Sequence, residues 1–350
     1  MDSSLKPDET LMYKEAKEAS VVVNRQLVSN HALIKNVAKA IQVLRKNGRP
    51  LVVLTCARGS SDHAASFAKY VFESQLGVIV SSVSPSIHSV YQSKQHLAGV
   101  LFLCISQSGK SPDLLTSAEQ AKLSGALVVS LVNDTQSPLA KLSNWVVPLQ
   151  AGAEKSVAAT KSFIASLSAI LHLTSQLAKS KTLNKALSLL PEQLDKAWQL
   201  DWERAESTLV KSHNLLVVGR GFGLAIAQEA ALKFKETCGI HAEAFSGAEV
   251  KHGPMTLVQK HFPVFMLGQD DETLKGLNAI ASEFSARDAR IYAAMRGGNE
   301  SWRLPTIQAE PMIEPLLLIQ RFYKLVNAVA IRRGMNPDAP PYLNKVTETH

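Results

Sequence analysis

Short apolar runs alternate with amphipathic segments along most of this chain. In the first half, five runs have the length of β-strands and cover residues 51–57, 78–83, 100–106, 127–132 and 145–149. Apolar residues at helical spacing separate some of these runs, as in residues 63–73 and 112–123. Continuous apolar strands that alternate with helices indicate a parallel sheet covered on both faces. The pattern therefore predicts a doubly wound α/β domain.

The same alternation restarts in the second half of the chain. We expect a strand and turn at 214–221, a helix at 223–237, strands at 262–267 and 289–295, and a late helix at 316–331. The turns that end at Gly59 and Gly221 both read Arg-Gly after a strand, and an Ala-rich helix follows each. This weak internal repeat predicts two α/β domains of the same type in tandem.

These segments predict five consecutive parts of the chain. They are an N-terminal helical segment (1–45), a first domain (46–180), a connecting helix (181–210), a second domain (211–333) and a C-terminal tail (334–350). Proline is frequent in the tail, which we therefore expect to be irregular.

Composition narrows the class of protein. Hydrophobic residues make up 46% of the chain and charged residues 19%, which excludes general disorder. The formal net charge of +8 is compatible with a small phosphorylated substrate. No dense run of Lys and Arg accompanies it, so we expect no nucleic-acid partner.

Cysteine usage and apolar segments exclude other classes. The three cysteines form no CxxC pair, so we expect neither a disulfide framework nor a metal site. The N-terminus lacks the basic and apolar regions of a signal peptide. A long apolar stretch, residues 163–173, contains Ser and His and is shorter than the ~20 residues that span a bilayer. We expect a cytoplasmic protein without a membrane partner.

The segment from Ser106 to Pro112 is a candidate anion site. It reads Ser-Gln-Ser-Gly-Lys-Ser-Pro between a predicted strand and a predicted helix, and Ser111 and Pro112 suit the first positions of that helix. Free N–H groups at such a helix start bind phosphate. A capped turn without a ligand is the alternative. The segment is not a P-loop, because Cys104 stands where that motif needs glycine.

A second candidate lies on the predicted helix at 223–237. Glu229, Lys233 and Glu236 are spaced so that they share one helix face, and their neighbours are small or apolar. The spacing leaves two interpretations open. The three residues form a salt-bridged stripe, or they form an acid–base pair with shifted pKa values.

His252 lies in the sequence Lys-His-Gly-Pro, which predicts a loop or turn. A loop histidine near a helix that carries carboxylates is a candidate proton shuttle. A solvated histidine without a catalytic role is the alternative.

Five ordered blocks make the chain resemble the sugar isomerase (SIS) family over about residues 45–350. The blocks are Ser106–Gly109, Glu154–Lys161, Ala231–Glu236, His241–Glu243 and Lys251–Pro254. The similarity is strongest to the isomerase half of glucosamine-6-phosphate synthase and to two-domain glucosamine-6-phosphate deaminases. It implies two flavodoxin-like SIS domains in tandem, of which the first binds phosphate and the second carries the catalytic helix.

The resemblance also implies roles for individual residues. The phosphate would be bound by Ser106, Gln107, Ser108 and Ser111, and the sugar by Ser61 and the backbone of Val157. No cofactor and no metal is implied.

The implied catalytic residues come from the second domain and the tail. Glu236 would move a proton between C1 and C2, with Lys233 beside it. His252 would open the sugar ring and would come from the neighbouring subunit, which implies a homodimer with a shared active site. Lys345 in the tail would close the site near the sugar carbonyl.

The chain departs from the family pattern at several positions. Arg58 replaces a cysteine, Ala159 replaces a serine, and no serine follows Lys345, which leaves the identity of the sugar open. The family's glutaminase nucleophile is a cysteine directly after the initiator Met, whereas Asp2 stands here. We therefore expect no ammonia from glutamine by that route.

The expected reaction converts glucosamine 6-phosphate and water into fructose 6-phosphate and ammonia. The alternatives are a deaminase of galactosamine 6-phosphate, an enzyme that cleaves phosphorylated sugar–amino-acid conjugates, and a sugar-phosphate sensor without turnover.

Overall fold

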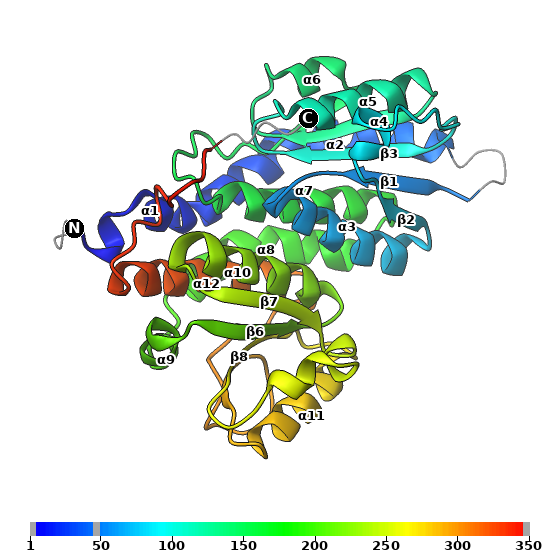
Figure 1. Cartoon of the computed structure of the whole chain (residues 1–350). Helices are drawn as coiled ribbons and strands as arrows, with labels where there is room; N and C mark the ends of the chain where they lie inside the picture. Colours follow the sequence, from blue (N-terminus) through cyan, green and yellow to red (C-terminus); the bar gives the residue numbers. More distant parts are fainter. Residues whose placement is uncertain (1–4, 45–49, 346–350) are drawn as a thin grey trace. The chain divides into compact units, whose positions relative to one another are not determined.

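The computed structural model describes residues 5–44 and 50–345, and these residues form two compact units (Figure 1). Unit A contains residues 21–44, 50–154, 161–188 and 344–345. Unit B contains residues 5–20, 155–160 and 189–343. Each unit is therefore assembled from separate stretches of the chain. The division into five consecutive parts stays a prediction.

Unit A is built on a parallel sheet of five strands in the order β2-β1-β3-β4-β5. The strands are β1 (Val52–Cys56), β2 (Ile79–Ser82), β3 (Leu101–Ser106), β4 (Leu127–Val132) and β5 (Trp145–Pro148). Every residue of the central strand β3 is buried, as its continuous apolar sequence predicts. The order of the strands reverses between β1 and β3, which makes the carboxyl ends of these two strands the place where such sheets bind ligands.

Helices cover both faces of this sheet, so the predicted doubly wound α/β fold is confirmed. The helices that lie wholly or partly in unit A are α2 (Ala19–Leu44), α3 (Ser60–Leu76), α4 (Ser86–Ser89), α5 (Pro112–Leu123), α6 (Pro138–Leu142), α7 (Lys161–Leu177) and α8 (Lys181–Trp198). Figure 1 shows α5 and α6 on one face of the sheet and α3 and α7 on the other. Phe102 and Cys104 of β3 pack with Leu114 of α5 and Leu139 of α6 in one apolar core. The helix α7 is buried on nearly all sides, as its apolar sequence requires.

Unit B repeats the architecture with a parallel sheet of four strands in the order β7-β6-β8-β9. The strands are β6 (Asn214–Gly219), β7 (His241–Ser246), β8 (Pro263–Leu267) and β9 (Arg290–Ala294). The predicted tandem of two α/β domains is thus confirmed. Strand β7 was not among the predicted strands. It lies at the edge of the sheet and is mostly exposed or half-buried, so its sequence lacks an apolar run.

The helices of unit B include one that precedes all the strands in sequence. They are α1 (Leu11–Lys17), α9 (Glu206–Lys211), α10 (Phe222–Cys238), α11 (Leu274–Ser285) and α12 (Glu314–Arg332), with short 3₁₀ turns η1 (Pro7–Glu9), η2 (Glu203–Ala205), η3 (Glu249–Lys251) and η4 (Pro254–Leu257). The backbone N–H groups of Leu11 and Met12 donate to the carboxylate of Asp338, 2.7 Å away in each case. This carboxylate satisfies the N–H groups at the start of α1, which have no partner within the helix.

An aromatic cluster fixes α10, the helix that carries Lys233 and Glu236. The Phe234 ring lies 5.1 Å from Phe322 of α12 and 6.1 Å from Phe265 of β8, both measured between ring centroids. At the start of the helix, a Cβ on Gly219 would overlap the carbonyl of Gly223, so only glycine lets the helix approach β6 this closely. The opposite face of α10 therefore has a fixed position within unit B.

Among the helices that the structure describes, none is long and apolar enough to cross a bilayer.

Candidate functional site

The serine loop, residues 106–111, joins β3 to α5 in unit A. The Ser106 hydroxyl accepts a hydrogen bond from the N–H of Gly109 at 3.0 Å. Gly109 has a φ of +63°, and a Cβ at this position would overlap the Ser137 side chain. The tight turn therefore requires glycine, and it directs the loop across the end of β3 toward the start of α5.

A cavity of about 330 Å³ lies at the carboxyl ends of β1 and β3. Its lining comprises Arg58, Gly59, Ser61, Ile105, Ser106, Gln107, Ser108, Ser111, Leu114 and Lys345. The lining thus includes the four residues predicted to bind phosphate. It also includes Ser61 and Lys345. None of these lining residues is acidic, and two of them are cations. The structure brings the predicted residues of unit A together around one cationic cavity.

The start of α5 adds to the attraction of this cavity for an anion. Ser111 is the N-cap residue of α5, and Pro112 is the first helical residue, as predicted. The Ser111 side chain makes no capping hydrogen bond, so its hydroxyl can serve a ligand in the cavity. The positive end of the helix dipole at this position favours a negative group.

Arg58 also lines the cavity, although it was not among the predicted site residues. Its Nε and Nη2 donate to the same oxygen of Asp113, at 2.9 and 2.6 Å. The Asp113 side chain is 1% exposed and lies in the first turn of α5, whereas Arg58 is 49% exposed. The one feature of the sequence that could have indicated the role of Arg58 is its position in the Arg-Gly-Ser turn directly after β1. The partner of that arginine is 55 residues away in sequence, so the sequence could not show where its guanidinium is held.

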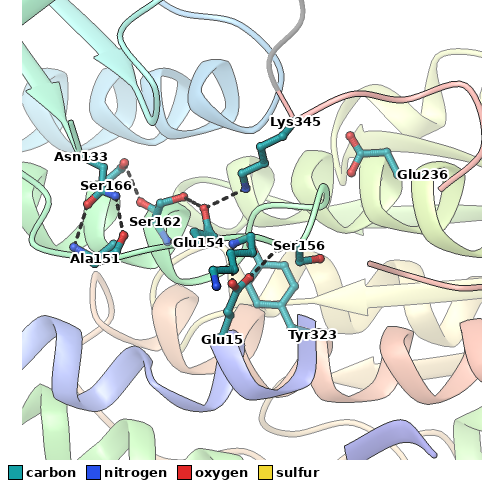
Figure 2. A network of polar contacts seen from close by, with 12 residues as sticks. Glu15, Asn133, Ala151, Glu154, Ser156, Ser162, Ser166, Glu236, Tyr323 and Lys345 are labelled. Carbon is teal, nitrogen blue, oxygen red and sulfur yellow. Dashed lines mark hydrogen bonds and ion pairs between the residues drawn. The ribbon is translucent and has the colours of Figure 1, made fainter. Parts of the chain in front are cut away.

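Lys345 is held in unit A by a buried carboxylate (Figure 2). Its Nζ lies 3.4 Å from Oε2 of Glu154, which also accepts a hydrogen bond from the Ser162 hydroxyl at 2.5 Å. The segment before Glu154 is fixed by Asn133, whose side chain bonds the N–H of Ala151 at 2.9 Å. Lys345 therefore lines the cavity and is paired with the buried carboxylate of Glu154.

In unit B, Lys233 lies between two carboxylates on α10. Its Nζ is 2.5 Å from Oε2 of Glu236 and 3.4 Å from Oε1 of Glu229. Tyr323 of α12 donates a hydrogen bond to Glu229 at 3.1 Å. Lys233 and Glu229 are buried, whereas the Glu236 side chain is 22% exposed. The three residues share one helix face, as their spacing predicts, and Glu236 is the one that a substrate can reach.

The pKa of Lys233 is raised by this arrangement. Burial alone would lower the pKa, but the attraction of Glu229 and Glu236 and their hydrogen bonds outweigh it. Lys233 is therefore a cation at neutral pH and not a neutral amine base.

His252 lies on an exposed turn of unit B, as predicted. The turn joins η3 to η4, and the N–H of His252 donates to the carbonyl of Glu249 at 2.9 Å. Within the described part of the chain, no hydrogen bond or ion pair joins His252 to Lys233 or Glu236. The structure therefore shows Lys233 and Glu236 paired on α10, and His252 on a separate, exposed turn.

Val157 belongs to unit B, in the short segment 155–160. Its N–H donates to the carbonyl of Asp338 at 3.1 Å. The carboxylate of Glu15 accepts hydrogen bonds from the N–H groups of Lys155 and Ser156, at 2.5 and 3.2 Å, as Figure 2 shows in part. The backbone around Val157 is therefore fixed by α1 and by Asp338 of the C-terminal tail.

The described residues contain no group of three or more His, Cys, Asp or Glu placed to hold a metal ion. The three cysteines are buried thiols without a disulfide. Burial raises the pKa of Cys56 and of Cys238 to about 12. These two thiols are therefore protonated at neutral pH and are poor nucleophiles.

Comparisons with known proteins agree with this geometry. The glutamine–fructose-6-phosphate aminotransferase (isomerizing) of Sulfurisphaera tokodaii is 34% identical over 338 residues, which are 95% of this chain and 56% of that protein. A crystal structure of a candidate phosphosugar isomerase from Silicibacter pomeroyi is 39% identical, with a TM-score of 0.89 over 94% of this chain and 100% of the other. The C-terminal domain of glucosamine-fructose-6-phosphate aminotransferase from Francisella tularensis is 26% identical, with a TM-score of 0.86 over 97% of this chain and 100% of that domain.

The chain spans just over half the length of the curated aminotransferase from Sulfurisphaera. A family model described as the SIS domain matches residues 52–175 and 208–301. The first range contains all five strands of unit A, and the second contains all four strands of unit B. Both sheets therefore lie inside the matched segments, and the chain belongs to the SIS domain family.

Proposed function

We propose that this chain is an isomerase of phosphorylated amino sugars, which converts glucosamine 6-phosphate and water into fructose 6-phosphate and ammonia. The observation that carries the proposal is the carboxylate of Glu236, which a buried lysine cation contacts at 2.5 Å and which is still partly exposed. Isomerisation needs one carboxylate that reaches two adjacent carbons of the substrate. Glu236 has the access and the charged neighbour that this task requires.

The cavity beside the serine loop supports a phosphorylated substrate. It combines three serine hydroxyls of the loop, the start of α5 and two cations, and no acidic residue lines it. This combination suits a phosphate dianion, because hydroxyls and N–H groups donate to its oxygens while the cations balance its charge. We assign the phosphate to Ser106, Gln107, Ser108 and Ser111, and a sugar hydroxyl to Ser61.

The proposed chemistry has three steps. His252 transfers protons between the ring oxygen and the anomeric hydroxyl, which opens the ring. Glu236 then takes the proton from C2 while O1 of the open-chain aldehyde gains a proton, which gives an enolamine. The same carboxyl group returns the proton to C1 while the nitrogen loses a proton, so that the C2 amine becomes a C2 imine. Water adds to this imine, and ammonia leaves as the C2 carbonyl of fructose 6-phosphate forms.

Lys233 and Lys345 have different roles in the proposal. Lys233 is a positioning residue, because its ammonium group contacts the Glu236 carboxylate at 2.5 Å and fixes its orientation. Lys345 is 25% exposed in the cavity and is held there by Glu154, so we assign it to the carbonyl oxygen of the open-chain sugar. We further propose that Val157 contacts the sugar through its backbone.

We also propose that the active form is a homodimer in which His252 of one subunit serves the site of the other. The support is that the turn of His252 is exposed and that, among the described residues, no hydrogen bond or ion pair joins its side chain to Lys233 or Glu236. Such a shared site requires a symmetric dimer.

The experiment that tests the proposal is an assay of ammonia release from glucosamine 6-phosphate, galactosamine 6-phosphate and phosphorylated sugar–amino-acid conjugates. Release of fructose 6-phosphate and ammonia from glucosamine 6-phosphate is the expected result. Preference for one of the other substrates would correct the sugar but keep the reaction class. Tight binding of a sugar phosphate without turnover of any substrate would identify a sensor and overturn the proposal.

A further inference from the structure

A second cavity in unit A is lined by α2, α7 and α8. Its volume is about 480 Å³. Its polar lining residues are His31, Lys35, His172, Gln176, Asn184 and Ser188, and none of them lines the cavity beside the serine loop. The cavity is therefore separate from the proposed active site, and no step of the proposed reaction uses it.

The ionisable residues that line this cavity are all basic. They are Lys35, His31 and His172, and none of the lining residues is acidic. The rings of His31 and His172 are stacked, with 5.8 Å between their centroids and 18° between their planes. The Lys35 ammonium group, with no carboxylate in the lining, gives the cavity a positive potential that attracts an anion, and the two imidazoles add hydrogen-bonding groups.

His172 is the most unusual member of the group. It is 4% exposed, and its imidazole has no hydrogen-bond partner among the residues that the structure describes. Burial, followed by the charges of His31 and Lys35, lowers the pKa of His172 to about 4. Because His172 lines the cavity, the hydrogen-bonding capacity of its imidazole is available to a molecule bound there.

An anion bound in the cavity would use this capacity. It would accept a hydrogen bond from the His172 imidazole and would balance the charge of Lys35. We propose that this cavity binds the phosphate group of a small phosphorylated metabolite. A phosphate monoester fits best because it carries close to two negative charges and three acceptor oxygens, which matches one full cation and two imidazole donors.

The test is an NMR titration of the full-length protein with inorganic phosphate at constant ionic strength. The probe is the ring C–H signal of His172, assigned by its loss in the His172→Gln variant. We expect a saturable shift of this signal and a rise of the His172 pKa when phosphate is present. The signal is specific for this cavity, so phosphate bound at the serine loop does not interfere.

Two further variants make the test independent of His172 itself. Lys35→Ala should weaken phosphate binding about tenfold, the usual effect of losing one charge-assisted contact. Lys39→Ala is the matched control, because Lys39 is an exposed lysine one turn further along α2 that does not line the cavity. It should leave the affinity unchanged.

Three outcomes would overturn the proposal. The first is a His172 signal that phosphate does not shift. The second is equal weakening by Lys35→Ala and Lys39→Ala, which would indicate general charge screening. The third is a saturable response to malonate with none to phosphate, which would identify a carboxylate site instead.

Discussion

Arg58 donates two hydrogen bonds to one oxygen of Asp113, and these bonds fix an arginine from the loop after β1 against the first turn of α5. The carboxylate is buried while the guanidinium is half exposed, so one side of the arginine is held and the other faces the cavity. If the cavity binds phosphate as we propose, Arg58 is positioned to contribute its charge.

We expect Arg58→Gln to weaken binding of the sugar phosphate about tenfold, because one charged hydrogen-bond donor is lost from the cavity. Turnover at saturating substrate should change little, because Arg58 lies in a different unit from Glu236. Steady-state kinetics would show the effect as a raised KM. Lys110→Gln is the control, since Lys110 lies in the serine loop but does not line the cavity. An equal effect of both substitutions would contradict a specific role of Arg58.

The Glu236→Gln variant should lose roughly 10²–10⁴-fold in turnover, the range for removal of a general base. The amide keeps the shape of the side chain but cannot accept the proton. Binding of the sugar phosphate should stay close to wild type, since the serine loop is unchanged. Exchange of the C2 proton with solvent, followed by NMR in heavy water, should stop as well.

Glu243→Gln serves as the control for that variant, because Glu243 is an exposed carboxylate of unit B near His241. Near-normal turnover by Glu236→Gln, or an equal loss in Glu243→Gln, would refute the assignment of Glu236 as the base.

Replacement of Lys233 by Met should destabilise the protein by about 3–5 kcal/mol, because it leaves Glu229 buried without its cation. The double variant Lys233→Met/Glu229→Gln should recover much of this loss, because the neutral amide can still accept the Tyr323 hydrogen bond. Urea unfolding would measure both. Lys69→Met, which breaks an exposed ion pair with Glu73, should change stability by about 1 kcal/mol or less. If the Lys233→Met variant were as stable as wild type, this would argue against a charged Lys233–Glu229 pair in the interior.

Acid should destabilise the protein through His172. The histidine pKa falls from its ordinary 6.5 to about 4 in the folded chain. Between these values the unfolded chain binds more protons, so the free energy of unfolding falls as the pH decreases from 6.5 to 4. A lowering of this size is worth at most about 3 kcal/mol. We expect the His172→Gln variant to lose less stability than wild type over this range, with no difference in slope above pH 7.

Complementation tests the shared active site. A mixture of Glu236→Gln and His252→Ala subunits should regain partial activity, because some mixed dimers contain one site with both groups intact. Each variant alone should stay inactive by comparison. If heterodimers form, as mass spectrometry can show, and activity is not restored, His252 acts within its own chain.

Local sequence predicted the elements that are buried on both sides or face one core. The strands β1 to β5 coincide with apolar runs of the sequence. Spacing alone placed Glu229, Lys233 and Glu236 on one face of α10. The edge strand β7 could not be recognised in the same way. Most of its side chains are exposed or half-buried, so its sequence contains no apolar run. The serine loop was predictable because its turn, its N-cap residue and its proline are consecutive.

Contacts between distant residues were not predictable from one sequence. Lys345 and Glu154 are 191 residues apart, and Asp338 accepts hydrogen bonds from α1 across more than 300 residues. The spacing of Glu229, Lys233 and Glu236 left a salt-bridged stripe and an acid–base pair with shifted pKa values as alternatives. The burial of Lys233 and its ion pairs with both glutamates come from the fold and could not be predicted from the spacing.

The peptide bond between Glu154 and Lys155 has a consequence for anyone who cuts this chain into fragments. Glu154 contacts Lys345 and Ser162 in unit A, whereas the N–H of Lys155 bonds Glu15 in unit B. The chain passes from one unit to the other at this bond and again after residues 20, 160, 188 and 343. No single cut yields either unit as one continuous piece of polypeptide. Expression of half the gene would therefore remove strands or helices from both units, and a working split version would need a break inside an exposed loop of one unit.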